Sequence, residues 1–272
     1  TMNNRNYIAF ICLFAFSFLF AAPALSRSGE SRPLVLYGEK AAPGEVHAAG
    51  ELARDIERVY GFKPGVSVYE DAGKEESLIS ENTSHIIAIG TPGSNSFIEA
   101  MVDAGVIEVS AENPGREAFV LLSTKYEKVP TLIIAGSDER GVLYGVYEYS
   151  RRFLGIDPYE YWTGKEPPKK ENFEIPEVNY REKPPVFPLR GYFDNDNDMI
   201  ANWRGEKLII EFDTWKEMID SLARLRYNYI DLHDTLGRAE FWTWEYYLKN
   251  FPGYETDLEL VDRIIDYAHS KG

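Results

Sequence analysis

The sequence predicts a mixed α/β fold: a mixed sheet with helices packed on it, followed by an incomplete (β/α)8 barrel. Three observations support this prediction. Short apolar runs alternate with amphipathic helical patterns over about residues 33–154. A proline-rich segment interrupts this alternation near residue 164. Beyond the prolines, a strand, helix, strand, helix order begins again.

The elements of the first part are predicted from apolar periodicity and from helix-capping residues. The expected strands span residues 34–37, 66–69, 85–89, 118–122 and 131–135. A helix over 45–60 has Val46, Ala49, Leu52, Ala53, Ile56 and Val59 on one face. Gly61 ends that helix, and a short helix over 94–104 follows. Ser137 and Asp138 begin a helix that runs to about Leu154.

A linker is predicted over residues 164–185, because prolines remove backbone donors and break helices. The prolines of this region are Pro167, Pro168, Pro176, Pro184, Pro185 and Pro188. The linker separates an accessory domain, residues 27–163, from a second part, residues 186–272.

The second part is predicted to hold two βα units. Strands are expected over 186–193 and 229–232. Asp213 begins a helix whose apolar face holds Trp215, Met218, Ile219, Leu222 and Leu225. A capping box of Thr256 and Glu259 begins a helix with Leu258, Val261, Ile264, Ile265 and Ala268 inward. A complete barrel needs roughly 200 residues or more, so we expect the chain to be a fragment of a longer protein.

Composition and charge narrow the class of partner. The chain has 272 residues, 44% of them hydrophobic and 27% charged, as in ordinary globular proteins. Its 29 Lys and Arg against 44 Asp and Glu give a net charge of −15, which repels phosphate backbones and argues against a nucleic-acid partner. Cys12 is the one cysteine, so no intramolecular disulfide or Cys/His metal cluster is expected, and we predict no cofactor and no metal.

The first residues have the layout of a signal peptide. Arg5 precedes an apolar run from Tyr7 to Phe20, and small residues follow it. The run is shorter than the roughly 20 apolar residues of a membrane span. We therefore expect residues 1–26 to be a signal peptide cleaved near Ala24 to Ser26, and the mature protein to be secreted or periplasmic, without a membrane attachment. An uncleaved N-terminal anchor is the alternative.

Four segments resemble a known group of enzymes. Residues 133–148 (IIAGSDERGVLYGVYE) and 153–162 (FLGIDPYEYW) resemble the N-terminal α/β domain of bacterial α-glucuronidases, glycoside hydrolase families 67 and 115. The second domain of β-N-acetylhexosaminidases is similar. Residues 184–196 (PPVFPLRGYFDND) and 222–230 (LARLRYNYI) resemble the beginning of the barrel that follows. The resemblance implies a hexosaminidase domain 2-like fold and then a barrel.

The resemblance also implies sugar hydrolysis, which usually needs two carboxyl groups. Barrel enzymes place such groups at the carboxyl ends of strands, where Asp194 and His233 are expected. Asn195 and Asp196 match an Asn-Asp pair of the family at the end of the first barrel strand. Asp196 is the candidate catalytic residue, and Asn195, Asp194 and His233 are candidate substrate-binding residues. The sequence departs from the family at Asn197, which leaves the role of Asp196 open.

Aromatic residues in the second part could stack on sugar rings. Trp203, Trp242 and Trp244 are expected on loops at the active face and are candidate substrate-binding residues, whereas Trp215 is expected in the core. Each candidate has a purely structural alternative: the acidic cluster as a solvated turn, His233 as a cap or core residue, the tryptophans as packing. An EF-hand calcium loop is a further alternative that fits poorly, because Met199 stands where that loop needs glycine.

The sequence thus predicts the N-terminal fragment of a secreted, α-glucuronidase-like glycoside hydrolase that acts on O-glycosidic bonds of an oligo- or polysaccharide. We expect this chain alone to lack a complete active site and to be inactive. The alternatives are a non-catalytic carbohydrate-binding protein, or a fragment of a β-N-acetylhexosaminidase or a polysaccharide lyase. The sequence indicates no particular oligomeric state.

Overall fold

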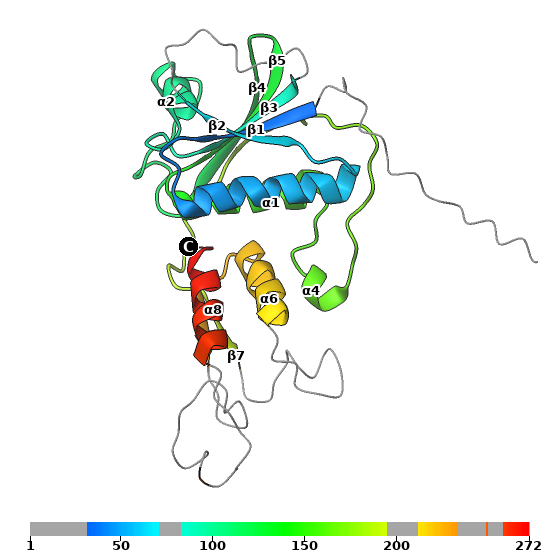
Figure 1. The fold of residues 1–272 in the computed structure, drawn as a ribbon. Helices are drawn as coiled ribbons and strands as arrows, with labels where there is room; N and C mark the ends of the chain where they lie inside the picture. The colour runs from blue at the N-terminus through cyan, green and yellow to red at the C-terminus, as the bar shows by residue number, and fades with distance from the viewer. Residues whose placement is uncertain (1–31, 71–82, 195–211, 233–248, 250–257, 272) are drawn as a thin grey trace, which may run out of the picture. The chain divides into compact units, whose positions relative to one another are not determined.

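A six-stranded mixed sheet forms the centre of the first part of the molecule (Figure 1). The computed structural model describes residues 32–70, 83–194, 212–232, 249 and 258–271. The strands are β1 (Arg32–Gly38), β2 (Gly65–Tyr69), β3 (Thr83–Gly90), β4 (Phe119–Tyr126), β5 (Val129–Gly136) and β6 (Asn179–Arg181). Their order is β2-β1-β3-β5-β4-β6; the first four pair in parallel, and β4 is antiparallel to both β5 and β6. This confirms the predicted mixed sheet.

Helices cover both faces of this sheet. On one face lie α1 (Pro43–Tyr60), α3 (Glu139–Tyr149) and the π-helix η1 (Ser150–Leu154), while α2 (Ser96–Asp103) covers the other (Figure 1). Side chains alternate along the strands accordingly: Ile87 and Ile89 pack toward α1, whereas Ala88 packs toward α2. The period of two in the buried strands therefore produces two separate apolar layers.

The ends of the helices follow the predicted signals. Gly61 has φ +76° and ends α1 in the left-handed conformation that glycine adopts most easily. The Asp138 carboxylate accepts a hydrogen bond from the Gly141 amide at 2.7 Å and begins α3. Two details differ from the prediction. Helix α2 begins at Ser96, capped by Asn95, rather than at Ser94, and Val46 on α1 is exposed instead of buried.

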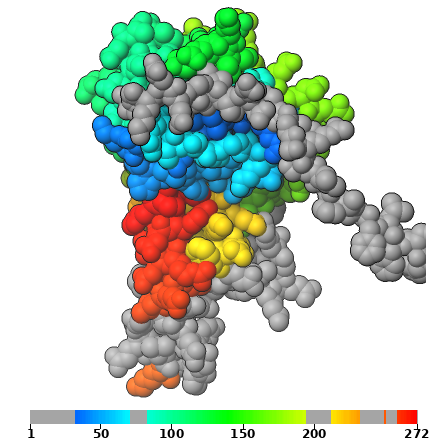
Figure 2. Space-filling model, turned by 45° about the horizontal axis from the view of Figure 1, so that its top comes forward, coloured from blue at the N-terminus to red at the C-terminus, as the bar shows by residue number. Residues whose placement is uncertain are grey.

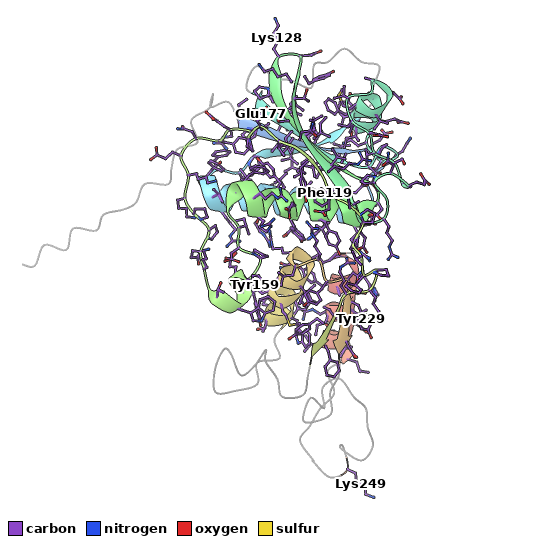
Figure 3. All side chains as sticks on the ribbon, turned by 180° about the vertical axis from the view of Figure 1, so that it is seen from behind. Phe119, Lys128, Tyr159, Glu177, Tyr229 and Lys249 are labelled. Carbon is purple, nitrogen blue, oxygen red and sulfur yellow. The ribbon has the colours of Figure 1, made fainter. Side chains whose placement is uncertain are left out.

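The β4–β5 hairpin is tighter than predicted. Glu127 and Lys128 alone form its turn, with φ values of +46° and +73°. Positive φ at both central residues matches the twist of paired strands, so each strand extends further toward the turn than apolar residues indicate. Lys128 marks the tip of the hairpin in Figure 3.

Two glycines let α3 approach the sheet closely, as their spacing of four predicts. A Cβ atom on Gly141 would lie 2.3 Å from the carbonyl oxygen of Ala118. One on Gly145 would lie 2.8 Å from a methyl group of Ile134. The first contact is to backbone, which has little freedom to move in a packed core.

The variant Gly141→Ala is therefore expected to lower the free energy of unfolding by about 2 kcal/mol, despite the better helix propensity of alanine. Urea denaturation followed by circular dichroism measures this. Gly50→Ala on α1 is the matched control, because Gly50 is exposed and a Cβ there meets nothing within 4 Å. That variant should be stabilising by up to about 1 kcal/mol. Equal effects of the two substitutions would contradict the close approach of α3.

Residues 164–185 are extended, but they are not wholly a linker. Asn179–Arg181 pairs with β4 as the edge strand β6, and Val178 beside it is buried. No proline stands between Pro176 and Pro184, so this stretch keeps the backbone donors that pairing requires. Glu177 precedes this strand and is labelled in Figure 3.

The second part contains the parallel strands β7 (Gly191–Asp194) and β8 (Tyr229–Leu232), with the helices α6 (Phe212–Arg224) and α8 (Leu258–His269). The short helix α4 (Glu160–Thr163), which precedes the proline-rich segment, packs Tyr161 and Trp162 against them. The core of the second part consists of Trp215, Met218, Ile219, Leu222, Leu260 and Ile264. The predicted core position of Trp215 is confirmed. Leu260 replaces Leu258 and Ile265 on the inward face of α8, since both of these are exposed.

Strand β7 begins five residues later than predicted. Val186 and Phe187 are 88% and 71% exposed and lie outside the strand. Prolines at 184, 185 and 188 remove the backbone donors that a longer strand would need. Apolar residues next to prolines thus do not extend the strand.

Candidate functional site

The carboxyl ends of β7 and β8 lie side by side. Gly191 pairs with Tyr229 and Asp194 with Leu232, in parallel and without a register shift. This confirms that the two predicted strands are adjacent and run in the same direction. The chain leaves both strands at the same end, which is where parallel sheets with helical crossovers carry their ligand sites.

Four of the seven predicted site residues stand, in the sequence, at the end of β7 or within two residues after β7 or β8. Asp194 is the last residue of β7. Asn195 directly follows β7 in the chain, and His233 directly follows β8. The predicted site residues that lie outside the described part of the chain are Asn195, Asp196, Trp203, His233, Trp242 and Trp244.

The two faces of the β7–β8 pair differ. Tyr192 and Ile230 pack against the core that α6 and α8 form. On the other face Phe193 and Tyr229 are about half exposed. Phe193 is next to the carboxyl end of β7, where an aromatic ring can contact an apolar face of a sugar ring. Tyr229 pairs with Gly191 at the amino ends of the strands.

The amino ends of the two strands are tied together by Arg190 and Asn228. The Arg190 amide donates to the Asn228 side-chain oxygen at 2.8 Å, and the Asn228 amide donates to the Arg190 carbonyl at 3.0 Å. The Arg190 guanidinium also donates to the carbonyls of Arg226 and Phe187. Arg190 and Asn228, which directly precede β7 and β8, therefore extend the pairing of the two strands by one residue.

Glu117, in the turn before β4, binds both of these residues. Its side chain is 1% exposed and accepts hydrogen bonds from Arg140 at 2.6 Å, from Asn228 at 3.1 Å and from Arg190. Burial opposes the charged form, but the hydrogen bonds from Arg140, Arg190 and Asn228 outweigh it and lower the pKa of Glu117. The carboxylate is therefore charged at neutral pH.

Glu148 on α3 is a second buried carboxylate that binds several arginines. It pairs with Arg151 at 2.7 Å, with Arg152 one residue further along, and with Arg226 at 3.0 Å. Hydrogen bonds from Arg151 and Arg152 outweigh its burial and lower its pKa. Arg226 has φ +65°, a conformation that non-glycine residues rarely adopt, and these contacts hold it there.

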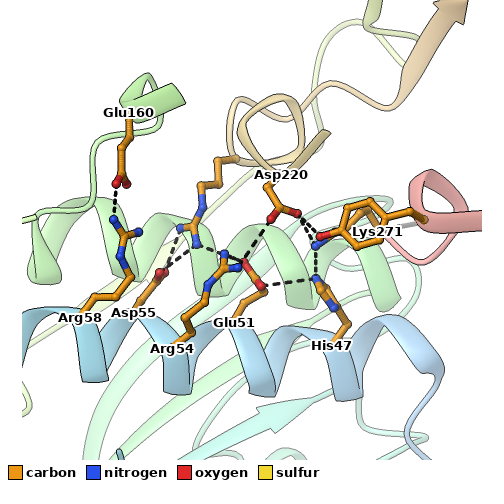
Figure 4. Close-up of polar contacts among 10 residues, drawn as sticks. His47, Glu51, Arg54, Asp55, Arg58, Glu160, Asp220 and Lys271 are labelled. Carbon is orange, nitrogen blue, oxygen red and sulfur yellow. Dashed lines mark hydrogen bonds and ion pairs between the residues drawn. The ribbon is translucent and has the colours of Figure 1, made fainter. Parts of the chain in front are cut away.

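A buried ion network joins α1 to α6 (Figure 4). Both helices belong to one unit of the chain, Ser31–Gly272. The Arg224 guanidinium donates to both oxygens of Asp55 at 2.9 Å and to Glu51 at 3.1 Å. The Asp55 side chain is 0% exposed. A planar guanidinium facing a carboxylate through two bonds is the strongest form of such a pair.

The network extends to α8. Arg54 pairs with Glu51 at 2.6 Å and with Asp220 at 3.6 Å. Asp220 accepts from Lys271 at 2.5 Å and from the Tyr267 hydroxyl at 2.6 Å. Figure 2 shows α6 and α8 against each other and against α1.

His47 closes this network at the beginning of α1. Its Nε2 atom accepts a hydrogen bond from Lys271, which requires the neutral ring. Burial, followed by the nearby charge of Lys271, lowers the pKa of His47 to about 4. His47 is therefore neutral at the pH values where most histidines begin to titrate.

These buried charges were not predicted. Glu51, Asp55 and Arg224 carry the periodicity of solvent-facing positions on amphipathic helices. The signal that could have revealed them is that Glu51 and Asp55, one turn apart and away from the apolar face of α1, form an acidic second contact surface.

An apolar cleft of about 430 Å³ lies between α6, β8 and α8. None of its described lining residues is a carboxylic acid, so these residues cannot supply the chemistry of glycoside hydrolysis. Among the described residues, no three His, Cys, Asp or Glu side chains are placed to hold a metal ion. None of the helices described is long and apolar enough to cross a membrane.

Comparison with known proteins agrees with this architecture. Residues 26–149 match the family model for the glycosyl hydrolase family 67 N-terminus. No curated protein sequence matches the chain. A solved structure of a family GH115 4-O-methyl-α-glucuronidase with specificity for decorated arabinogalactans is similar over 90% of this chain, with 26% identity and a TM-score of 0.60.

A GH138 enzyme targeting pectin rhamnogalacturonan II is similar over 88% of this chain and 30% of its own, with 13% identity and a TM-score of 0.49. This chain spans 28% of the length of the GH115 structure. Together, the family model and the GH115 structure support an α-glucuronidase-like glycoside hydrolase N-terminal region in the first part of this chain.

Proposed function

We propose that this chain is the amino-terminal part of an exported glycoside hydrolase that removes uronic acid side groups from polysaccharides. The observation that carries the proposal is the similarity to the GH115 4-O-methyl-α-glucuronidase, which covers 90% of the chain and so extends into its second part. In this proposal residues 1–26 are a signal peptide and residues 27–163 an accessory domain. Residues 164–185 connect the accessory domain to 186–272, the first two βα units of a (β/α)8 barrel.

The parallel pair of β7 and β8 supports the barrel. Parallel neighbours joined by α6 are the repeating unit of this fold, and α6 packs on one face of the pair. The opposite face, with Phe193 and Tyr229, corresponds to the interior of the barrel. Two strands cannot enclose an active site, so further strands must complete it.

The candidate catalytic residue remains Asp196, two positions beyond the end of β7. We propose that it serves as an acid/base or stabilises developing charge. We propose that Asp194, Asn195 and His233 bind sugar hydroxyl groups, and that Trp203, Trp242 and Trp244 stack on sugar rings.

The test compares this chain with the longer enzyme of which it is proposed to be the amino-terminal part. The purified 272-residue chain should release no sugar from arabinogalactan decorated with 4-O-methylglucuronic acid. The enzyme that carries it should release uronic acid, and its Asp196→Asn variant should lose about 100-fold in kcat, because a positioned general acid or base contributes about this much.

Asp103→Asn is the control, because Asp103 is exposed at the end of α2 on the far face of the sheet. It should leave kcat unchanged. If the enzyme releases no uronic acid, the proposed function is wrong. If Asp196→Asn retains full activity, Asp196 has no catalytic role.

A further inference from the structure

Three of the segments that resemble the family meet at one buried carboxylate. Arg140 belongs to residues 133–148, Arg190 to 184–196 and Asn228 to 222–230, and each donates a hydrogen bond to Glu117. The catalytic proposal uses none of these three residues. Their convergence on one group calls for its own explanation.

The positions of the donors are informative. Arg190 directly precedes β7, and Asn228 directly precedes β8. Asn228 reaches Oε1 of Glu117 while Arg190 reaches Oε2, so one carboxylate holds the first positions of both strands. Arg140 approaches from α3 and shares Oε1 with Asn228, which anchors the carboxylate to the six-stranded sheet.

We propose that Glu117 is a positioning residue that fixes the level of β7 relative to β8. Because the strands pair without a register shift, fixing their amino ends also fixes their carboxyl ends. Asp194 then ends at the same height as Leu232, its partner across the strand pair. The accessory sheet thereby sets the geometry of the edge that carries the candidate site. Only the link to sugar cleavage rests on the proposed function.

The surroundings of Glu117 constrain both its backbone and its side chain. Its backbone has φ +60° and its amide donates to Asp138 at 2.9 Å, so the turn itself is held by the cap of α3. With the side chain 1% exposed, a displaced partner would leave a charge buried without compensation. A glutamine would face the Arg190 guanidinium with an amide that also donates.

Hydrogen exchange on the whole chain, followed by mass spectrometry, tests the proposal. In Glu117→Gln the backbone amides of β7 and β8 should exchange about tenfold faster, while those of β3 and β5 change less than about twofold. A merely stabilising residue would accelerate both sets alike. Equal acceleration in the two sets, or none in β7 and β8, would overturn the proposal.

Glu45→Gln is the matched control. Glu45 is also a buried carboxylate, but it accepts from Ala42, Thr91 and Ser94 within the accessory domain. Its substitution should accelerate exchange around the beginning of α1 and leave β7 and β8 unchanged.

Asn228→Ser provides a second variant from the opposite side of the contact, and it carries the test if Glu117→Gln does not fold. It should accelerate hydrogen exchange of the same amides. The double variant should exchange no faster than the faster single variant, because both substitutions disrupt the same contact between Glu117 and Asn228. Additive effects would count against a shared role. Exchange does not depend on sugar cleavage, so a failure here is distinct from a failure to release uronic acid.

Discussion

Replacement of Arg224 by methionine is expected to lower the free energy of unfolding by about 3–5 kcal/mol. The guanidinium donates to both oxygens of Asp55 and to Glu51, and all three side chains are almost fully buried. Methionine fills much of the same volume but removes both hydrogen bonds to Asp55 and leaves Glu51 with Arg54 as its arginine partner. Urea denaturation followed by tryptophan fluorescence measures the loss.

Two further variants isolate the cause of this loss. Arg54→Met removes a more exposed guanidinium from the same network, 42% accessible, and should cost about 1 kcal/mol or less. Adding Asp55→Leu to Arg224→Met should recover part of the stability, because an apolar pair needs no compensating charge. A loss below 1 kcal/mol in Arg224→Met would show that water reaches the carboxylates and that the network is not buried in solution.

The stability of the protein is expected to fall by up to about 3 kcal/mol between pH 6.5 and pH 4 because of His47 alone. Its pKa in the folded protein is about 4, lowered by burial and then by Lys271. In this pH range the unfolded chain binds a proton that the folded chain does not bind. Stability is therefore present above the unfolded pKa of about 6.5 and decreases as the pH falls toward 4.

The variant His47→Gln should remove this slope, since glutamine keeps an acceptor for Lys271 and does not titrate. Unfolding free energies from urea titrations at half-unit steps of pH give the comparison. Val46→Ala is the control on the same helix, because Val46 is exposed. If wild type and His47→Gln lose stability in parallel, the histidine is already charged in the folded protein.

Local signals predicted most of the fold. Gly61 and Asp138 mark helix ends through their own backbone and side-chain chemistry, which depends on neighbours within a few residues. The apolar stripe of α6 predicted the buried position of Trp215 for the same reason. The edge strand β6 was missed because three residues within a proline-rich segment carry too little periodicity.

The polar interior could not be predicted in this way. Asp55 and Arg224 are 169 positions apart, and each is unremarkable on its own helix. Only the packing of α6 on the second face of α1 makes them buried partners. For the candidate site, the sequence predicted correctly that β7 and β8 are parallel neighbours, and Asp196 remains a prediction that follows from the position of β7.

The buried ion network also bears on the response of this protein to salt. Mobile ions weaken attraction between charges on the surface, but they cannot enter a contact from which water is excluded. The ion-paired contact between α1 and α6 should therefore be as stable at high salt concentration as in dilute buffer. In a protein that is proposed to be exported, the contact between these two helices would then depend little on the ionic strength of the surroundings.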